Sequence, residues 1–190
     1  NAKIAQGYDV INLGQGNPDQ PTYDFIVEAL CQSAKNPKSH QYSAFRGNKN
    51  LKEAVVQFYQ REYGVELDPE KEVCIFGGAK IGLVELPLAL MNPDDLLLLP
   101  DPGYPDYLSG VALGQVRYET FPLLEKNDFL PDYSAFSNEV LEKAKFIYLN
   151  YPNNPTGAVA NQAFYDETVA FAKKHQIGII SDLAYGALGA

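Results

Sequence analysis

The chain has 190 residues, 46% hydrophobic and 21% charged, a composition typical of a globular protein with a sizeable core. Its formal net charge of −9 argues against nucleic acid or an anionic membrane surface as a partner. No apolar run approaches the roughly 20 residues of a membrane span, and the two histidines lack the spacing of metal ligands. We expect a cytoplasmic protein without a metal, with Cys31 and Cys74 reduced and buried in the core.

Short apolar runs alternate along the chain with longer amphipathic segments. The short runs predict strands at DVINL (9–13), VCIF (73–76), LLLL (96–99), VRYETF (116–121), FIYLN (146–150) and GIIS (178–181). The amphipathic segments predict helices over residues 22–35, 50–63, 79–91, 104–113 and 161–175.

The runs LLLL and FIYL are apolar on both faces, which is typical of parallel strands covered by helices on both sides. Strands that alternate with helices of this length predict an α/β fold: three layers, with a mostly parallel sheet and helices on both faces. Ligands bind such sheets beyond the carboxyl ends of the strands, so the loops at those ends should carry the chemistry.

Two of these loops are rich in glycine or proline. FGGAK (76–80) follows a strand and begins a helix, so its N–H groups can bind an anion, although a tight strand–helix turn explains it equally well. Its glycines fit neither the P-loop nor the dinucleotide fingerprint. PDPGYPDY (100–107) is a rigid bend that can present Tyr104 to a flat ligand, whereas we interpret Tyr107 as padding.

Polar side chains follow two further strands. NYPNNPTG (150–157) places amides on a backbone stiffened by prolines, and SDLAY (181–185) places a carboxylate at a strand end, where helix capping is the alternative role. NLGQGNPD (12–19) and QYSAFRG (41–47) add glycines, a tyrosine and an arginine in irregular sequence. Each segment alone is most often structural. Together they describe a pocket for a flat, phosphorylated aromatic cation.

In this chain order, the segments NLGQGNPD, YSAFRG, GGAK, DPGYPDY, NYPNNPTG and SDLAY resemble the landmarks of the class I aminotransferases, which use pyridoxal 5'-phosphate (PLP). The resemblance covers almost the whole chain, and NNPTG followed by D-x-A-Y is its most specific pair. It implies the large PLP-binding domain of an aspartate-aminotransferase-like protein of fold type I.

The resemblance implies roles around the cofactor ring for four residues. Asp182 would hold the proton on the pyridine nitrogen, and Asn154 with Tyr185 would share the phenolic oxygen of the ring. Tyr104 takes the place of the aromatic residue that stacks on the ring. Asn153 is expected to be a turn residue.

Five further residues are implied to bind the phosphate or the substrate. Gly78, Ala79 and Lys80 would hold the phosphate through backbone N–H groups. Many relatives have a hydroxyl residue in this loop, which is replaced here, and Lys80 can compensate by charge. Tyr42 would reach the phosphate of a neighbouring subunit, which implies a homodimer, and Gly16 would lie against the substrate carboxylate.

The chain departs from the family pattern at its end. The Schiff-base lysine of the family follows the D-x-A-Y strand, and a C-terminal small domain with a carboxylate-binding arginine comes later. We therefore expect a truncated chain that is inactive alone. Residues 1–20 would lead into the fold, and residues 21–190 would form the incomplete PLP-binding large domain.

Three functions fit this pattern. The first is an aminotransferase that moves an amino group from an amino acid to a 2-oxo acid. The glycine-rich and YSAFRG segments look most like the branch acting on methionine, aromatic or other neutral amino acids. The second is a PLP-dependent C–S lyase, which shares most of the landmarks, and the third is a non-catalytic ligand-binding domain.

Overall fold

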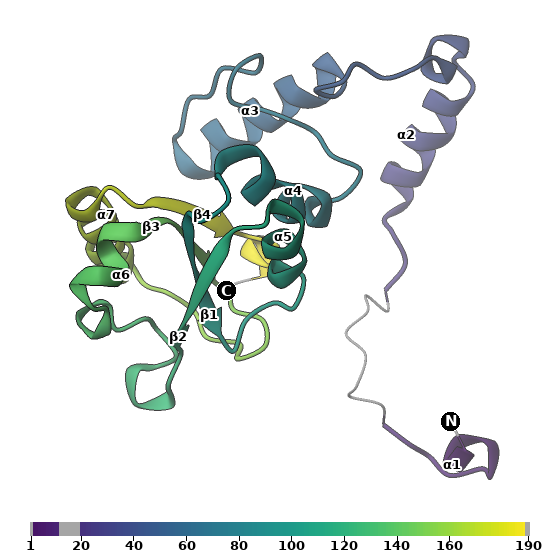
Figure 1. The fold of residues 1–190 in the computed structure, drawn as a ribbon. Coiled ribbons are helices and arrows are strands. Elements are labelled where there is room, and N and C mark those ends of the chain that lie inside the picture. The colour runs from purple at the N-terminus through teal and green to yellow at the C-terminus, as the bar shows by residue number, and fades with distance from the viewer. Residues whose placement is uncertain (1, 12–19, 189–190) are drawn as a thin grey trace. The chain divides into compact units, whose positions relative to one another are not determined.

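The computed structural model describes residues 2–11 and 20–188 (Figure 1). It divides the chain into two compact units, Asn1–Asn48 and Lys49–Ala190. In the part that the structure describes, no helix is long and apolar enough to cross a membrane.

The first unit contains short helical elements. They are α1 (Ala2–Ala5), α2 (Asp24–Ala34) and the 3-10 helix η1 (Pro37–His40). Helix α2 confirms the helix predicted over residues 22–35. Residues 9–11 of the predicted strand DVINL form no strand, and Asn12 and Leu13 lie outside the described residues.

The second unit alternates helices and strands. In chain order they are α3 (Lys49–Tyr63), α4 (Ala79–Leu90), β1 (Leu96–Asp101), α5 (Tyr107–Gly114), β2 (Arg117–Pro122), η2 (Glu125–Asn127), η3 (Tyr133–Ala135), α6 (Asn138–Lys143), β3 (Ala144–Asn150), α7 (Gln162–His175), β4 (Gly178–Asp182) and η4 (Gly186–Leu188). The strands predicted at 96–99, 116–121, 146–150 and 178–181 are confirmed, as are the helices α3, α4, α5 and α7.

The four strands form one parallel sheet in the order β2-β1-β3-β4. From β1 the chain moves to β2 on one side and then crosses to β3 on the other side of β1. The connections that leave the carboxyl ends of the neighbouring strands β1 and β3 therefore run to opposite sides, which makes a topological switch point, where ligands bind in sheets of this kind.

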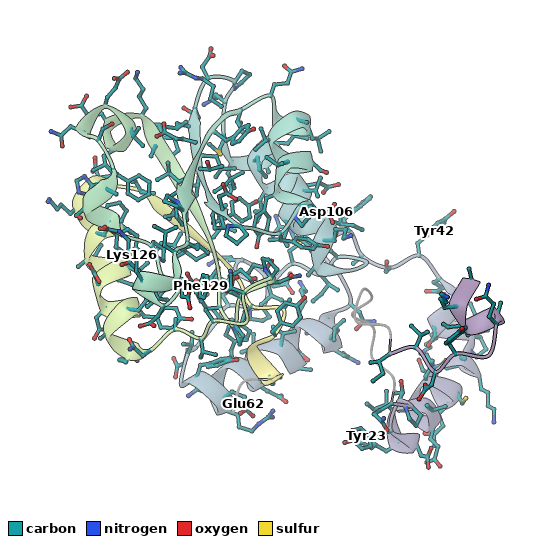
Figure 2. All side chains as sticks on the ribbon, turned by 90° about the horizontal axis from the view of Figure 1, so that it is seen from below. Tyr23, Tyr42, Glu62, Asp106, Lys126 and Phe129 are labelled. Carbon is teal, nitrogen blue, oxygen red and sulfur yellow. The ribbon has the colours of Figure 1, made fainter. Side chains whose placement is uncertain are left out.

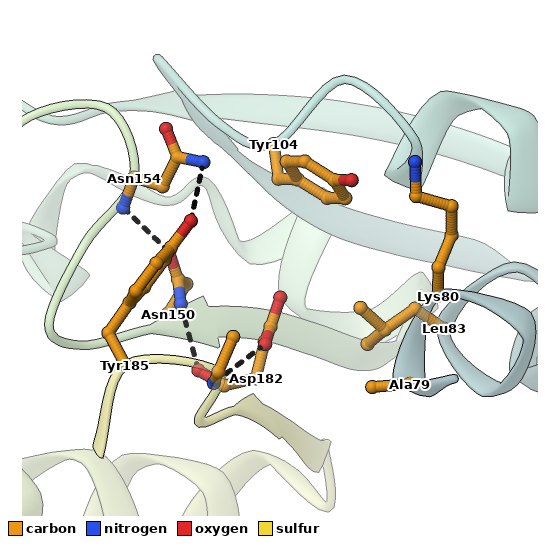
Figure 3. Close-up of a pocket in the computed structure, with 9 residues that line it drawn as sticks. Ala79, Lys80, Leu83, Tyr104, Asn150, Asn154, Asp182 and Tyr185 are labelled. Carbon is orange, nitrogen blue, oxygen red and sulfur yellow. Dashed lines mark hydrogen bonds between the residues drawn. The ribbon is translucent and has the colours of Figure 1, made fainter. Parts of the chain in front are cut away.

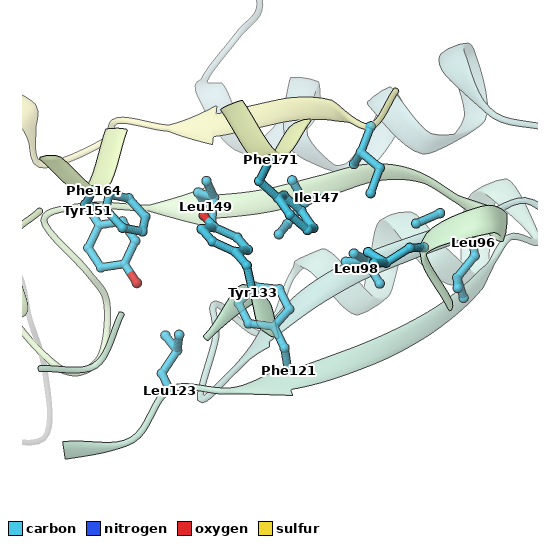
Figure 4. Packing of buried hydrophobic residues seen from close by; sticks show 13 residues of the cluster. Leu96, Leu98, Phe121, Leu123, Tyr133, Ile147, Leu149, Tyr151, Phe164 and Phe171 are labelled. Carbon is cyan, nitrogen blue, oxygen red and sulfur yellow. The ribbon is translucent and has the colours of Figure 1, made fainter. Parts of the chain in front are cut away.

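Helices cover both faces of this sheet, as the sequence predicts (Figure 1). Side chains of β1 alternate between the faces: Leu96 and Leu98 pack in a cluster with residues of α6 and α7, and Leu97 and Leu99 in a cluster with residues of α5. Figure 4 shows the first cluster, in which Ile147 has no exposed surface. The fold is a three-layer α/β fold.

Two of the sequence predictions are wrong. VCIF (73–76) forms no strand: Val73 is buried, but Phe76 is 44% exposed, and none of the described strands pairs with this segment. An apolar run becomes a strand only where a neighbour accepts its backbone hydrogen bonds. Cys31 and Cys74 are free, as expected, but both are exposed rather than in the core.

Helix α6 has no counterpart among the predicted elements. It has only six residues, too few for a helical repeat of apolar positions to stand out. Ser137 begins it, because the Ser137 hydroxyl accepts a hydrogen bond from the Val140 N–H at 3.3 Å.

Candidate active site

One pocket of about 130 Å³ lies at the carboxyl ends of β1, β3 and β4, within the second unit (Figure 3). Tyr104 follows β1, Asn154 follows β3, and Asp182 ends β4. The pocket is lined by Ala79, Lys80, Leu83, Tyr104, Asn150, Asn154, Asp182, Ala184 and Tyr185. The structure thus brings together six of the residues that the sequence singles out: Ala79, Lys80, Tyr104, Asn154, Asp182 and Tyr185.

Asp182 is a buried carboxylate, 8% exposed, whose two oxygens are oriented by different donors. Its Oδ2 accepts a hydrogen bond from the Tyr107 hydroxyl at 2.8 Å, and its Oδ1 accepts one from the Ala184 N–H at 3.2 Å. No lysine, arginine or histidine of the described chain forms an ion pair with it. A buried carboxylate of this kind favours a cationic group in the pocket.

Tyr107 is a residue whose role the sequence did not predict. It is 2% exposed, begins α5 and supports the Asp182 carboxylate, so its interpretation as padding is wrong. Burial, followed by the hydrogen bond to Asp182, raises the pKa of Tyr107 far above its ordinary range, so the hydroxyl keeps its proton. Local sequence offered no signal for this role, because Tyr104 and Tyr107 sit in an aromatic loop and the partner Asp182 lies 75 positions further along the chain.

Asn154 and Tyr185 meet on another side of the pocket. The Asn154 side-chain amide donates a hydrogen bond to the Tyr185 hydroxyl at 3.1 Å, and both residues are half-buried. Because the Tyr185 oxygen is the acceptor in this bond, the Tyr185 O–H can still donate to another group. An amide N–H and a phenol O–H that converge in this way can bind one oxyanion between them.

The loop between β3 and α7 is held rigid by its own side chains. Asn153 is buried, and its Oδ1 accepts hydrogen bonds from the Thr156 hydroxyl at 2.7 Å and the Thr156 N–H at 3.1 Å. Its Nδ2 donates to the Asn150 carbonyl at 3.1 Å. Asn153 therefore acts as the turn residue that the sequence predicts, and leaves Asn154 to face the pocket.

The sequence profile of the family "Aminotransferase class I and II" matches residues 8–190. The chain belongs to this family. The family implies PLP as the cofactor.

Similar proteins of this family are known in sequence and in structure. The chain is 56% identical over 189 residues to the L-glutamine–4-(methylsulfanyl)-2-oxobutanoate aminotransferase of Bacillus subtilis, covering 100% of this chain and 48% of that protein. It is 51% identical over 183 residues to the LL-diaminopimelate aminotransferase of Maridesulfovibrio salexigens, covering 95% and 47%. A substrate-bound structure of BacF from Bacillus subtilis has a TM-score of 0.89 at 54% identity, covering 98% of this chain and 47% of that one.

The chain spans about half the length of the curated relatives it matches. The match begins at Tyr8 and continues to the last residue, so it covers most of the first compact unit and all of the second.

Tyr104 and Lys80 both line the pocket. The Lys80 Nζ lies 2.6 Å from the Asp106 carboxylate and 5.6 Å from the centroid of the Tyr104 ring. The hydrogen bond that Lys80 donates to Asp106, followed by its hydrogen bond with Tyr104, raises the pKa of Lys80, and the bond accepted from Lys80 lowers the pKa of Asp106. Lys80 is 62% exposed, so solvent screens this ion pair.

The GGAK segment begins helix α4 beside the pocket. Gly78 is its N-cap with φ of 116°, a left-handed conformation that favours glycine. It lines a neighbouring hollow that also includes Ala79 and Asp182. Because the first turn of a helix leaves its N–H groups without intrahelical acceptors, Ala79 and Lys80 can offer theirs to an anion.

Two of the predicted site residues, Tyr42 and Gly16, are not among the described residues that line the pocket. Tyr42 belongs to the first unit, and its side chain is fully exposed (Figure 2). Gly16 lies outside the described residues. The roles that the resemblance implies for both stay predictions.

Proposed function

We propose that the full-length protein is a PLP-dependent aminotransferase that moves an amino group from an amino acid to a 2-oxo acid. One observation supports this most directly. The buried carboxylate of Asp182 and the converging donors of Asn154 and Tyr185 line a single pocket, under the ring of Tyr104.

The chemistry of these groups fits PLP. In the proposal Asp182 lies beside the protonated ring nitrogen, since a buried carboxylate without a cation in the described chain suits a cationic ring. Asn154 and Tyr185 hold the phenolic oxygen, and Tyr104 covers the ring face. The residues Gly78, Ala79 and Lys80 bind the phosphate at the start of α4.

PLP, when bound, supplies a conjugated ring that takes up the electrons released when a bond at the amino acid's α-carbon breaks. The residues of this chain prepare the pocket for that chemistry. Asp182 holds a proton at the ring nitrogen and keeps its orientation through Tyr107 and Ala184. The Asn154 amide and the Tyr185 hydroxyl stabilise negative charge on the ring oxygen.

We propose a neutral amino acid and its 2-oxo acid as the substrate class, with 4-(methylsulfanyl)-2-oxobutanoate as the first acceptor to test. The relative whose name carries this compound is 56% identical over 189 residues. LL-diaminopimelate is the alternative, because a relative of that name is 51% identical.

We propose a cytoplasmic homodimer in which Tyr42 reaches the phosphate of the neighbouring subunit, and in which residues 21–190 form part of the PLP-binding large domain. An exposed Tyr42 is compatible with that role. We place the lysine that attaches PLP after Tyr185 in the full-length protein, and propose that residues 1–190 alone are inactive.

The test is an assay of the full-length protein with PLP, glutamine and 4-(methylsulfanyl)-2-oxobutanoate. We expect methionine as the product, together with an absorbance change of the bound cofactor on adding the amino donor alone. Release of pyruvate and ammonia from an S-substituted cysteine would favour the C–S lyase instead. A protein that binds no PLP would overturn the proposed function.

A further inference from the structure

Asn150 is the last residue of β3, and its side chain lines the pocket between the two groups just assigned to the cofactor ring. It is 3% exposed. Figure 3 shows its side chain between the loop that carries Asn154 and the end of β4 that carries Asp182.

Both ends of the Asn150 amide are in use. Its Oδ1 accepts a hydrogen bond from the Asn154 N–H at 2.7 Å, and its Nδ2 donates one to the Asp182 carbonyl at 2.9 Å. A backbone N–H can only donate and a carbonyl can only accept, so the two partners allow one orientation of this amide. Asn150 and Asp182 are also register partners across β3 and β4.

These bonds close a ring around one wall of the pocket. Asn150 links the backbone of Asn154 to the backbone of Asp182. Tyr185 lies three residues after Asp182, and its hydroxyl accepts a hydrogen bond from the Asn154 side chain, which closes the ring. The Asn150 amide in this network is buried and bonded at both ends, so it holds its two partners at a fixed spacing. Loss of Asn150 would leave the Asn154 N–H and the Asp182 carbonyl without this partner and would free the loop to move away from β4.

We propose that Asn150 is a positioning residue that fixes the spacing between the Asn154 amide and the Asp182 carboxylate, and thereby sets how tightly the pocket holds the cofactor ring. This inference rests on the proposed function. A side chain that only stabilised the ends of β3 and β4 would affect folding but not ring binding, so the two roles are separable.

The probe is pyridoxamine 5'-phosphate, which carries the same ring and phosphate and needs no covalent bond to the protein. Its dissociation constant would be measured by calorimetry with the full-length protein freed of cofactor. We expect Asn150→Ala to weaken binding about tenfold, the scale on which supporting residues of a binding site act. The matched control is Asn161→Ala, which also removes an amide that accepts from a backbone N–H, Phe164 at 2.9 Å, but at the start of α7 outside the pocket. We expect that control to lower thermal stability and to leave binding within about twofold of the parent.

Two further variants test how Asn150 acts. Asn150→Asp keeps the acceptor for the Asn154 N–H but sets a carboxylate oxygen against the Asp182 carbonyl, which also only accepts, so we expect it to bind no more tightly than Asn150→Ala. In an Asn154→Ala background, the effect of Asn150→Ala should shrink to about twofold, because the two residues act as one unit.

Several results would overturn the inference. They are an Asn150→Ala variant that binds as the parent does, an Asn150→Asp variant that binds as the parent does, and a full tenfold effect that persists in the Asn154→Ala background. If the parent protein itself fails to bind the probe, the proposed function fails instead.

Discussion

Buried tyrosines lie on both faces of the sheet, but their hydroxyl groups bond to different parts of the molecule. On the face covered by α4 and α5, the Tyr107 hydroxyl donates to Asp182 and the Tyr148 hydroxyl donates to the Leu83 carbonyl, both at 2.8 Å. On the face covered by α6 and α7, the Tyr133 hydroxyl lies 2.6 Å from the Thr168 hydroxyl, and Thr168 itself donates to the Phe164 carbonyl. On the α4/α5 face the bonds end in the pocket wall, whereas on the α6/α7 face they stay in the core. Substitutions of equally buried residues should therefore affect both stability and ligand binding on the α4/α5 face, but stability alone on the α6/α7 face.

The largest effect should follow from removing the charge where the α4/α5 face meets the pocket. We expect Asp182→Asn to lower amino transfer by the full-length protein at least about a hundredfold, since the charge beside the ring is lost while the shape is kept. Steady-state kinetics would measure this. Asp132→Asn, which changes an exposed carboxylate on the α6/α7 side, is the control and should retain activity. An Asp182→Asn enzyme within about twofold of the parent would contradict the assignment.

The next largest effects should come from large-to-small substitutions that leave a similar cavity on each face of the sheet. Leu97 and Leu98 are adjacent in β1 and both have no exposed surface, but they belong to opposite clusters. We expect Leu97→Ala and Leu98→Ala each to cost about 3 kcal/mol of unfolding free energy, measured by urea denaturation. Only Leu97→Ala, in the cluster with Tyr107 and Tyr148, should also weaken binding of pyridoxamine 5'-phosphate. Equal weakening by both variants would remove the functional difference between the faces.

On the α6/α7 face, the buried Tyr133 should make the unfolding free energy depend on alkaline pH. Burial raises the pKa of Tyr133 from 10.0 to about 12. Above pH 10 the unfolded chain releases this proton while the folded protein keeps it until about pH 12, so the stabilisation is complete below pH 10 and falls as pH rises through that window. Within that window Tyr133 should lower the unfolding free energy by about 1.4 kcal/mol for each pH unit. Urea unfolding between pH 9 and 11 should show a shallower decline for Tyr133→Phe, and an unchanged slope would count against this account.

The smallest effects should come from single hydroxyl groups. Tyr107→Phe and Tyr133→Phe each remove one buried hydrogen bond, so we expect each to lower the unfolding free energy at pH 8 by about 1 kcal/mol. Tyr107→Phe alone should also weaken binding of pyridoxamine 5'-phosphate, because Asp182 Oδ2 loses its donor. Tyr133→Phe serves as the control, because Thr168 keeps its bond to the Phe164 carbonyl. If both variants bind the probe equally well, Tyr107 has no part in orienting Asp182.

The sequence was most informative where a strand is buried on both faces. The runs LLLL and FIYL predict β1 and β3 because such continuous apolar stretches need helices on both sides. VCIF has a similar composition but forms no strand, since pairing depends on a neighbour that local sequence does not reveal.

The site was predictable as a set of residues but not as a network. Asn154, Asp182 and Tyr104 could be singled out because they follow strands and match a family pattern. Tyr107 and Asn150 could not, because a tyrosine in an aromatic loop and an asparagine at a strand end usually have local roles. Their partners lie 75 and 32 positions away along the chain, and only folding brings them together.

The register between β3 and β4 limits where this chain can change length. Asn150 faces Asp182 across the two strands, and successive side chains of a strand point to opposite sides. An extra residue inside β4 would turn the acidic group away from the hollow it serves. The same insertion at the exposed residues Gly64–Glu66, which follow α3, would change no strand register and should cost little. Natural variants of this half of the protein should therefore gain and lose residues in the turns, while strand lengths stay constant.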